Sequence, residues 1–231
     1  MNVLIFGSSG MIGQGVLREC LLDAGIANVT TVGRSPGVAP PGVRATKLQD
    51  LVVKDLFDLS SVEADLSGYD ACFYCLGPSS SGMSEEDYER ITFGLTTNVA
   101  AILARRNPQM TFTYVSGAGT DSSEKGRLAW ARVKGKTENT ILRLPFKAAY
   151  MFRIAAVIPA NGERSRTTLY RVLYTVLSPL APLIKWAFPS QVLTTVDVGR
   201  AMIRAARAGA SEKVLESPDI GALARAAARQ S

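Results

Sequence analysis

The sequence predicts a doubly wound α/β fold: a parallel sheet with helices on both faces and a small C-terminal helical lobe. Two observations predict it. Apolar, β-rich runs alternate with amphipathic helical runs from the first residue to about residue 158. Strands that alternate with helices at this spacing form parallel sheets that are covered on both sides. In addition, a glycine-rich turn joins the first of these strands to the first helix.

The expected strands are short apolar runs bounded by turn residues, at 2–6, 28–33, 50–53, 71–77, 111–117 and 148–157. The expected helices carry apolar side chains on one face and cover residues 11–24, 84–105, 122–141 and 196–208. From about residue 159 the alternation fades into a helical region broken by prolines, which predicts the small lobe.

Composition excludes several classes of function. The chain contains no histidine, which excludes Ser-His-Asp and Cys-His catalysis and removes the commonest ligand of catalytic zinc, so we expect no metal site. The net charge of +6 comes from scattered lysines and arginines, so we expect no nucleic-acid partner. The N-terminal stretch lacks a basic region and a long apolar run, so we expect no signal peptide and a cytoplasmic protein.

The three cysteines are expected to be buried and reduced. Cys72 and Cys75 have the spacing of a redox pair, but they lie in an expected strand. Residues three apart on a strand point to opposite faces and are separated by about 10 Å along it, which is beyond the reach of a disulfide.

The turn "GSSGMIG" lies directly between the first strand and the first helix, which is typical of a dinucleotide-binding site. The first glycine permits a tight turn, the second permits close approach of a pyrophosphate, and the third permits close packing of helix on strand. The free N–H groups at the helix start then hold the diphosphate. The residues expected to bind the cofactor here are Gly7, Ser9, Gly10, Met11, Ile12 and Gly13. The alternative is a glycine turn that serves packing alone.

The end of the second strand favours NADP(H) over NAD. An acidic residue there would bind the adenosine ribose hydroxyls, but the chain has Arg34 and Ser35. A guanidinium and a hydroxyl suit a 2′-phosphate, although a solvated Arg34 is the alternative. Asp55 and Leu56, just after the third strand, are expected to frame the adenine; the alternative is that Asp55 is an exposed surface residue.

With these pieces the chain resembles the short-chain dehydrogenase/reductase family, particularly its atypical, NAD(P)-binding branch. That branch includes epimerase-like reductases and Tat-interacting-protein-like proteins. The resemblance covers nearly the whole chain, which would then be a single Rossmann-like domain over residues 1–231, with a cofactor-binding core at 1–158 and a substrate or partner lobe at 159–231. The motifs that carry it are "GSSGMIG", "CLG", "YVSGAGTDSS", "WARVKGKTEN" and "FRIAAVIP".

The resemblance implies roles for residues in these motifs. Ser116 matches the serine that orients a substrate carbonyl. Lys134 matches the lysine that binds the nicotinamide ribose and lowers the pKa of a catalytic tyrosine. The remaining implied cofactor contacts are Cys75, Leu76 and Gly77 beside the adenosine half, and Val157 and Pro159 against the nicotinamide ring.

The chain departs from the family at Trp130, which stands where the catalytic tyrosine is expected. An indole N–H is a hydrogen-bond donor that cannot act as a general acid and base at neutral pH, so we expect cofactor binding to survive and carbonyl reduction by the usual route to be lost. Without the resemblance, Trp130 would be a core aromatic and Lys134 a solvated charge. Tyr114 is expected to pack under a helix, and Tyr170 with Tyr174 is the alternative source of a proton.

Two classes of function therefore remain open. One is a weak NADP-dependent reductase or epimerase acting on a small carbonyl or hydroxyl substrate. The other is a non-catalytic, redox-sensing NADP(H)-binding protein with an unknown protein partner; a homodimer is compatible with either. Arg164 and Arg166 are either phosphate contacts or a solvated loop. The apolar stretch 169–188 either lines a pocket, forms an interface or contacts a membrane surface.

Overall fold

The structure is a computed structural model, and it describes residues 1–163 and 191–228. Its strands are β1 (Asn2–Phe6), β2 (Asn28–Gly33), β3 (Leu48–Val52), β4 (Ala71–Tyr74), β5 (Thr111–Gly117), β6 (Ala148–Ile154), β7 (Ala156–Ile158), β8 (Val192–Thr194) and β9 (Val214–Glu216). Its helices are α1 (Met11–Leu22), the 3-10 turn η1 (Glu63–Leu66), α2 (Glu85–Glu89), the π-helical segment η2 (Arg90–Leu95), α3 (Thr96–Arg106), α4 (Ala129–Leu142), α7 (Thr195–Ala208) and α8 (Ser217–Ala228).

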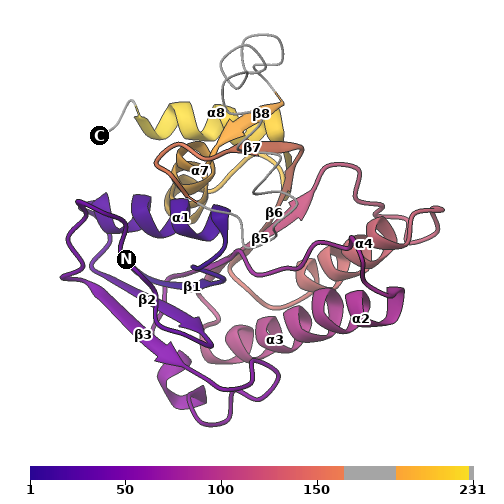
Figure 1. The fold of residues 1–231 in the computed structure, drawn as a ribbon, viewed down its shortest axis with the longest axis horizontal. Helices are drawn as coiled ribbons and strands as arrows, with labels where there is room; N and C mark the ends of the chain where they lie inside the picture. Colours follow the sequence, from indigo (N-terminus) through magenta and orange to yellow (C-terminus); the bar gives the residue numbers. More distant parts are fainter. Residues whose placement is uncertain (164–190, 229–231) are drawn as a thin grey trace.

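In the described part of the chain, seven strands form one sheet in the order β3-β2-β1-β4-β5-β6-β9, and every neighbouring pair is parallel (Figure 1). From β1 the chain first builds the sheet outward through β2 and β3, and then returns to add β4 on the other side. In open α/β sheets, ligands bind outside the carboxyl ends of the strands at such a reversal. The predicted fold class is confirmed.

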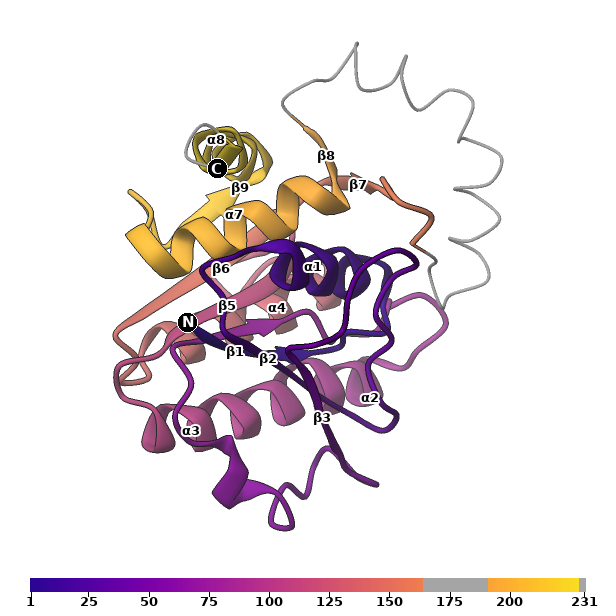
Figure 2. The same ribbon diagram turned by 90° about the vertical axis from the view of Figure 1, so that its left-hand side faces the viewer.

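Two helical layers cover the sheet (Figure 2). α1, α7 and α8 lie over one face, and α2, α3 and α4 lie over the other. Within β1, Val3 and Ile5 belong to the core under α1, whereas Leu4 and Phe6 belong to the core under α3. Successive side chains of a strand point to opposite faces, so a continuous apolar run fills both cores. The predicted C-terminal helical portion is present in α7 and α8.

The helix that the sequence predicts over residues 122–141 begins only at Ala129. Asp121 holds the preceding residues in a loop, because its carboxylate accepts hydrogen bonds from the backbone N–H groups of Ser123 (3.0 Å) and Gly126 (2.6 Å). Glu124 has a φ of +61° in this loop, which lies outside the right-handed helical region. Local side-chain bonds of this kind compete with helix formation.

The strands predicted at 50–53, 71–77 and 148–157 have different bounds in the structure. β3 starts earlier, at Leu48, and β4 stops at Tyr74. β6 stops at Ile154, and the chain then leaves the main sheet so that β7 pairs with β8. The backbone N–H of Ala155 donates to Ser217 Oγ (3.0 Å) at this change of direction. The three-residue strands β8 and β9 are too short to give a recognisable apolar pattern.

Candidate cofactor and active site

A cavity of about 640 Å³ lies outside the carboxyl ends of β1, β2, β4 and β5, where the strand order reverses. It brings together most of the residues that the sequence singles out. The predicted site residues that line it are Gly7, Ser9, Gly10, Met11, Ile12, Arg34, Ser35, Asp55, Leu56, Cys75, Leu76, Gly77, Ser116 and Lys134. Residues from six separate stretches of the chain therefore meet at one place.

The glycine turn has the geometry that a diphosphate needs. Gly7 has a φ of +80°, and its carbonyl accepts a hydrogen bond from the Gly10 N–H (3.0 Å). A side chain at Gly7 would meet the backbone of Leu76 at 2.6 Å, and one at Gly13 would meet the Gly7 carbonyl oxygen at 2.0 Å. Gly10 differs, since its nearest neighbour would be 3.5 Å away. The close packing of the turn thus requires glycine at positions 7 and 13, whereas open space adjoins Gly10.

The start of α1 faces this room with unpaired backbone donors. Gly10 is the N-cap residue and supplies no side-chain cap, and the first turn carries no acidic residue. Helices leave their first N–H groups without intrahelical partners, and these groups attract anions. Met11 and Ile12, which carry such groups, line the cavity. The turn therefore fits the diphosphate of a dinucleotide.

The adenosine end of the cavity is lined by Arg34 and Ser35, which follow β2 and are exposed. The neighbouring carboxylate of Asp50 is engaged elsewhere, because it accepts hydrogen bonds from Thr31 Oγ1 and from the Gly37 N–H (2.7 Å). Asp55 lines the cavity, yet its Oδ1 accepts the backbone N–H of Phe57 (2.9 Å). Arg34 thus supplies a positive charge at this end of the cavity, and Asp55 supplies a negative one.

Ser116 lies near the end of β5 and is only 5% exposed. Its Oγ is 3.1 Å from Thr120 Oγ1, and Thr120 Oγ1 donates to the Gly117 carbonyl (2.7 Å). Since the Thr120 proton is used in that bond, Ser116 is the donor to Thr120. The Ser116 oxygen retains its lone pairs, and a rotation about its side chain turns the hydroxyl toward a ligand in the cavity.

Lys134 reaches the same end of the cavity from α4. Its Nζ donates to Tyr114 Oη (3.4 Å) and to the Val115 carbonyl (3.5 Å), and both distances are long for N–H···O hydrogen bonds. The ammonium also lies 5.1 Å from the centre of the Tyr114 ring. Burial lowers the pKa of Lys134 to about 8, and the nearby Glu138 carboxylate opposes that shift. Burial raises the pKa of Tyr114 well above its usual value.

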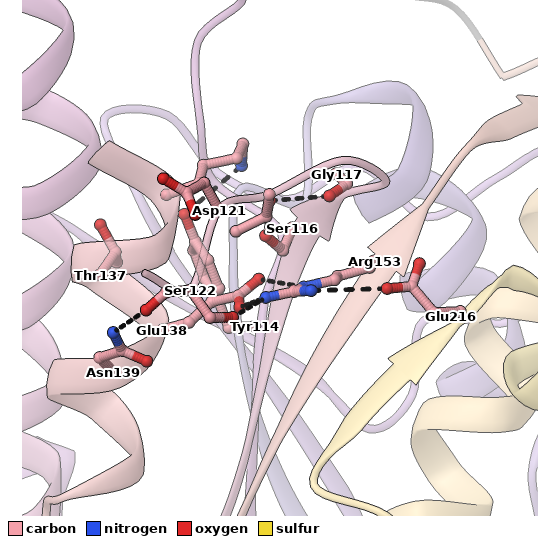
Figure 3. A network of polar contacts seen from close by, with 12 residues as sticks. Tyr114, Ser116, Gly117, Asp121, Ser122, Thr137, Glu138, Asn139, Arg153 and Glu216 are labelled. Carbon is pink, nitrogen blue, oxygen red and sulfur yellow. Dashed lines mark hydrogen bonds and ion pairs between the residues drawn. The ribbon is translucent and has the colours of Figure 1, made fainter. Parts of the chain in front are cut away.

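A buried ion pair supports this end of the site from below. Glu138 is 1% exposed, and Arg153 of β6 donates from Nε and Nη2 to its carboxylate at 3.1 and 2.6 Å. Figure 3 shows Arg153 between Glu138 on one side and Glu216 on the other. Arg153 is also the strand partner of Ser116. The pair therefore ties α4, which carries Lys134, to the strands beside Ser116.

Trp130 does not line the cavity. The Trp130 ring packs over Gly117 and Gly119 at the start of the loop after β5. A Cβ atom added at either glycine would lie 3.7 Å from the ring. Val157 is buried in the pairing of β7 with β8, and Pro159 follows it; neither lines the cavity in the described structure. Gly13 is likewise not part of the cavity lining, because it packs against the Gly7 carbonyl. The expected contacts of Val157 and Pro159 with the nicotinamide ring therefore have no support from the cavity geometry.

Several cavity residues are missed by the sequence reasoning. Ile91 and Leu95 belong to the π-helical segment η2 within the helix predicted over 84–105, and Phe57 and Ser79 come from loops. π-helical segments often occur at functional sites, but they have no signal in a single sequence. Arg164, Arg166, Tyr170, Tyr174 and the stretch 169–188 lie outside the described residues.

The cysteines are free: Cys20 and Cys72 are buried, while Cys75 lies partly exposed at the cavity. Cys72 and Cys75 pack against opposite cores, as expected. Among residues 1–163 and 191–228 no group of histidine, cysteine or acidic side chains has the arrangement of a metal site. Nor does a helix in those ranges have the length and apolar content needed to cross a membrane.

Comparison with known proteins agrees with this geometry. Residues 3–128 match the model of the NAD dependent epimerase/dehydratase family. "Protein fmp52, mitochondrial" of Emericella nidulans is 25% identical over 222 residues, covering 92% of this chain and 93% of that protein. "Protein HTATIP2" of Rattus norvegicus is 26% identical over 165 residues, covering 71% of this chain and 66% of that protein.

Solved structures share the fold. WbmH of Bordetella bronchiseptica, solved in complex with NAD+, has a TM-score of 0.65 at 17% identity and covers 93% of this chain and 74% of its own. The UDP-N-acetylglucosamine 4-epimerase of Methanobrevibacter ruminantium has a TM-score of 0.62 at 11% identity and covers 92% and 74%. Since the family model spans more than half of the 231 residues, this chain belongs to the NAD dependent epimerase/dehydratase family and is an atypical, epimerase-like member of the short-chain dehydrogenases.

Proposed function

We propose that this protein binds NADP(H) and acts as a reductase or epimerase on a small carbonyl or hydroxyl compound. The observation that carries the proposal is a single cavity that joins the diphosphate turn, a free guanidinium and the Ser116–Lys134 pair. A bound nicotinamide supplies or accepts a hydride there. Ser116 orients the reacting oxygen, and the ammonium of Lys134 has donors left for the cofactor ribose.

The preference for NADP(H) rests on the charge at the end of β2. Arg34 makes no hydrogen bond or ion pair with the described residues, and it lines the cavity. A guanidinium binds phosphate with two parallel hydrogen bonds, whereas it gains little from neutral ribose hydroxyls. NAD is the cofactor in the complex of the WbmH neighbour, so the preference is a property we propose for this chain alone.

Replacing Arg34 with alanine tests the preference. We expect Arg34→Ala to raise the Kd of NADPH about 10–100-fold, the loss of one or two charge-assisted hydrogen bonds. The Kd of NADH should change less than about 2-fold, because NADH lacks the 2′-phosphate. Both constants are measured by quenching of protein fluorescence.

Arg44→Ala is the matched control, since Arg44 is an exposed arginine in the same loop between β2 and β3 and does not line the cavity. It should leave both affinities unchanged. Equal losses for NADPH and NADH in Arg34→Ala would contradict the NADP(H) preference. Absence of binding of either nucleotide to the wild type would contradict the proposed function as a whole.

The second candidate is a redox-sensing protein that binds NADP(H) without turnover, favoured by Trp130 at the position that the family resemblance assigns to the catalytic tyrosine. Turnover distinguishes the two candidates. A sensor binds NADPH but does not oxidise it, whichever carbonyl compound is added. A cytoplasmic location stays a prediction, since the fungal relatives are named as mitochondrial proteins. A homodimer and a protein partner likewise stay predictions.

A further inference from the structure

Carbonyl reduction in this cavity requires a proton donor beside Ser116. Of the tyrosines in the described residues, at positions 69, 74, 88, 114 and 150, none lines the cavity. Trp130 lies against the neighbouring glycines instead, and its indole N–H is too weak an acid to protonate an oxygen in the reaction. The hydroxyl of Ser116 is not acidic enough to act alone, and burial raises the pKa of Cys75 to about 12.

Among residues 1–163 and 191–228, Lys134 is the remaining group at this end with a proton that it can give and regain. Its Nζ lies against the carbonyl of Val115, the residue before Ser116, and it lines the same cavity. The two hydrogen bonds that it makes within the described structure are long, at 3.4 and 3.5 Å. An ammonium has three donors, so at least one is left for a ligand.

No carboxylate in the described part of the chain forms an ion pair with Lys134 and so holds its proton. The Glu138 carboxylate, one helical turn away, is engaged by Arg153 at 2.6 Å and does not form an ion pair with Lys134. Tyr114 of β5 faces Nζ with a neutral hydroxyl, and Tyr88 of α2 lies near Tyr114. The pKa of about 8 that burial gives Lys134 suits a group that donates a proton near neutral pH.

We propose that Lys134 is itself the proton donor of this protein, in addition to its contact with the cofactor ribose, and that Tyr114 positions its ammonium. The proposal rests on the proposed function. The carbonyl carbon receives the hydride of the reduced nicotinamide, and the electron pair of the C=O double bond moves onto oxygen. That oxygen takes a proton from Lys134 Nζ while Ser116 orients it. The amine that remains regains a proton from water, and the product is an alcohol.

The decisive variant is Lys134→Arg. A guanidinium keeps the positive charge and the donors that hold a ribose, but it does not release a proton below pH 12. We expect Lys134→Arg to bind NADPH within about 5-fold of the wild type and to reduce nitrobenzaldehyde or phenanthrenequinone at least about 100-fold more slowly. Lys136→Met, which removes a lysine paired with Glu89 on the outer side of α4, should behave like the wild type.

The pH dependence gives a second readout. The donor must carry its proton, so the wild-type rate should be constant below pH 8 and fall as the pH rises through the pKa of Lys134. Tyr114→Phe removes an oxygen that accepts from the ammonium. It should move this alkaline limb to lower pH without abolishing the rate, an effect that a merely structural role would not produce.

A measurement on the cofactor-free protein adds a readout that is independent of activity. The Nζ resonance that disappears in Lys134→Met should titrate near pH 8 in nitrogen NMR. Titration in the ordinary lysine range, at about 10.4, would overturn the proposal. So would a wild-type rate and pH profile in Lys134→Arg, or a wild type that binds NADPH and reduces neither carbonyl. Failure of the wild type to bind NADPH would instead overturn the proposed function beneath it.

Discussion

The ammonium of Lys134 is partly buried between α4 and β5, and burial lowers its pKa to about 8. A lysine whose pKa is lower in the folded protein destabilises the fold at neutral pH, because folding removes its charge from water. Between pH 8 and about 10.4 the unfolded chain keeps the proton that the folded protein has released, so this penalty fades as the pH rises. The buried ammonium that the proposed function needs therefore lowers the stability of the fold at neutral pH.

Replacing Lys134 with an apolar side chain tests the opposition. We expect Lys134→Met to stabilise the protein at pH 7 by about 1 kcal/mol, a figure reduced for partial exposure, or about 2–4 °C in Tm. The gain should shrink as the pH approaches 10. Thermal unfolding followed by circular dichroism at pH 7 and 9.5 measures both effects. A lower Tm for Lys134→Met at pH 7 would mean that the ammonium stabilises the fold.

At the scale of elements, the glycines of the β1–α1 turn have different roles: Gly13 is needed for folding, and Gly10 is expected to serve cofactor binding. Gly13→Ala would place a side-chain atom 2.0 Å from the Gly7 carbonyl, so turn and helix must move apart. We expect this overpacking to cost at least about 1–3 kcal/mol in the free energy of unfolding. Gly10→Ala meets nothing closer than 3.5 Å and should leave stability within about 0.5 kcal/mol while weakening NADPH binding.

Urea unfolding and fluorescence titration of the two variants measure these effects side by side. The alternative reading of the motif, a turn that serves packing alone, would be supported if Gly10→Ala bound NADPH as tightly as the wild type. Loss of stability in Gly10→Ala would show that its added methyl group does not fit the turn.

At the scale of the whole molecule, the Glu138–Arg153 pair joins α4, β6 and β9 beneath the cavity (Figure 3). Removing one member of a buried pair leaves the other charge without compensation, which costs about 3–5 kcal/mol. We expect Glu138→Ala to lower the free energy of unfolding by that amount. Glu85→Ala is a matched control. Glu85 of α2 forms an ion pair with Arg132, which is on α4 like Glu138; the distance is again 2.6 Å, but this pair is exposed.

The control should cost no more than about 1 kcal/mol, since solvent screens an exposed pair. Both variants are compared by urea unfolding at pH 7. Equal losses would mean that burial does not govern the strength of these pairs and that the network beneath the cavity is not special.

The sequence by itself determined the fold class, the approximate positions along the chain of the first six strands, and the glycine turn between the first strand and the first helix. These features depend on local signals: apolar runs of strand length, helical periodicity and glycines at fixed spacing. The carboxyl ends of parallel strands meet at one edge of a sheet, which brings Arg34 and Ser116 to one cavity, whereas Lys134 on α4 was expected there only from the family resemblance.

Tertiary structure alone decided the rest. β9 is found only because its three residues pair with β6, and the late start of α4 follows from the bonds that Asp121 makes across its loop. Contacts between separate elements bury Lys134 in part and bring its ammonium to Tyr114. Another such contact pairs the Glu138 carboxylate with Arg153 instead of with Lys134. They set the protonation of the lysine, and protonation depends on burial and neighbouring charge, which residue identity and spacing do not contain.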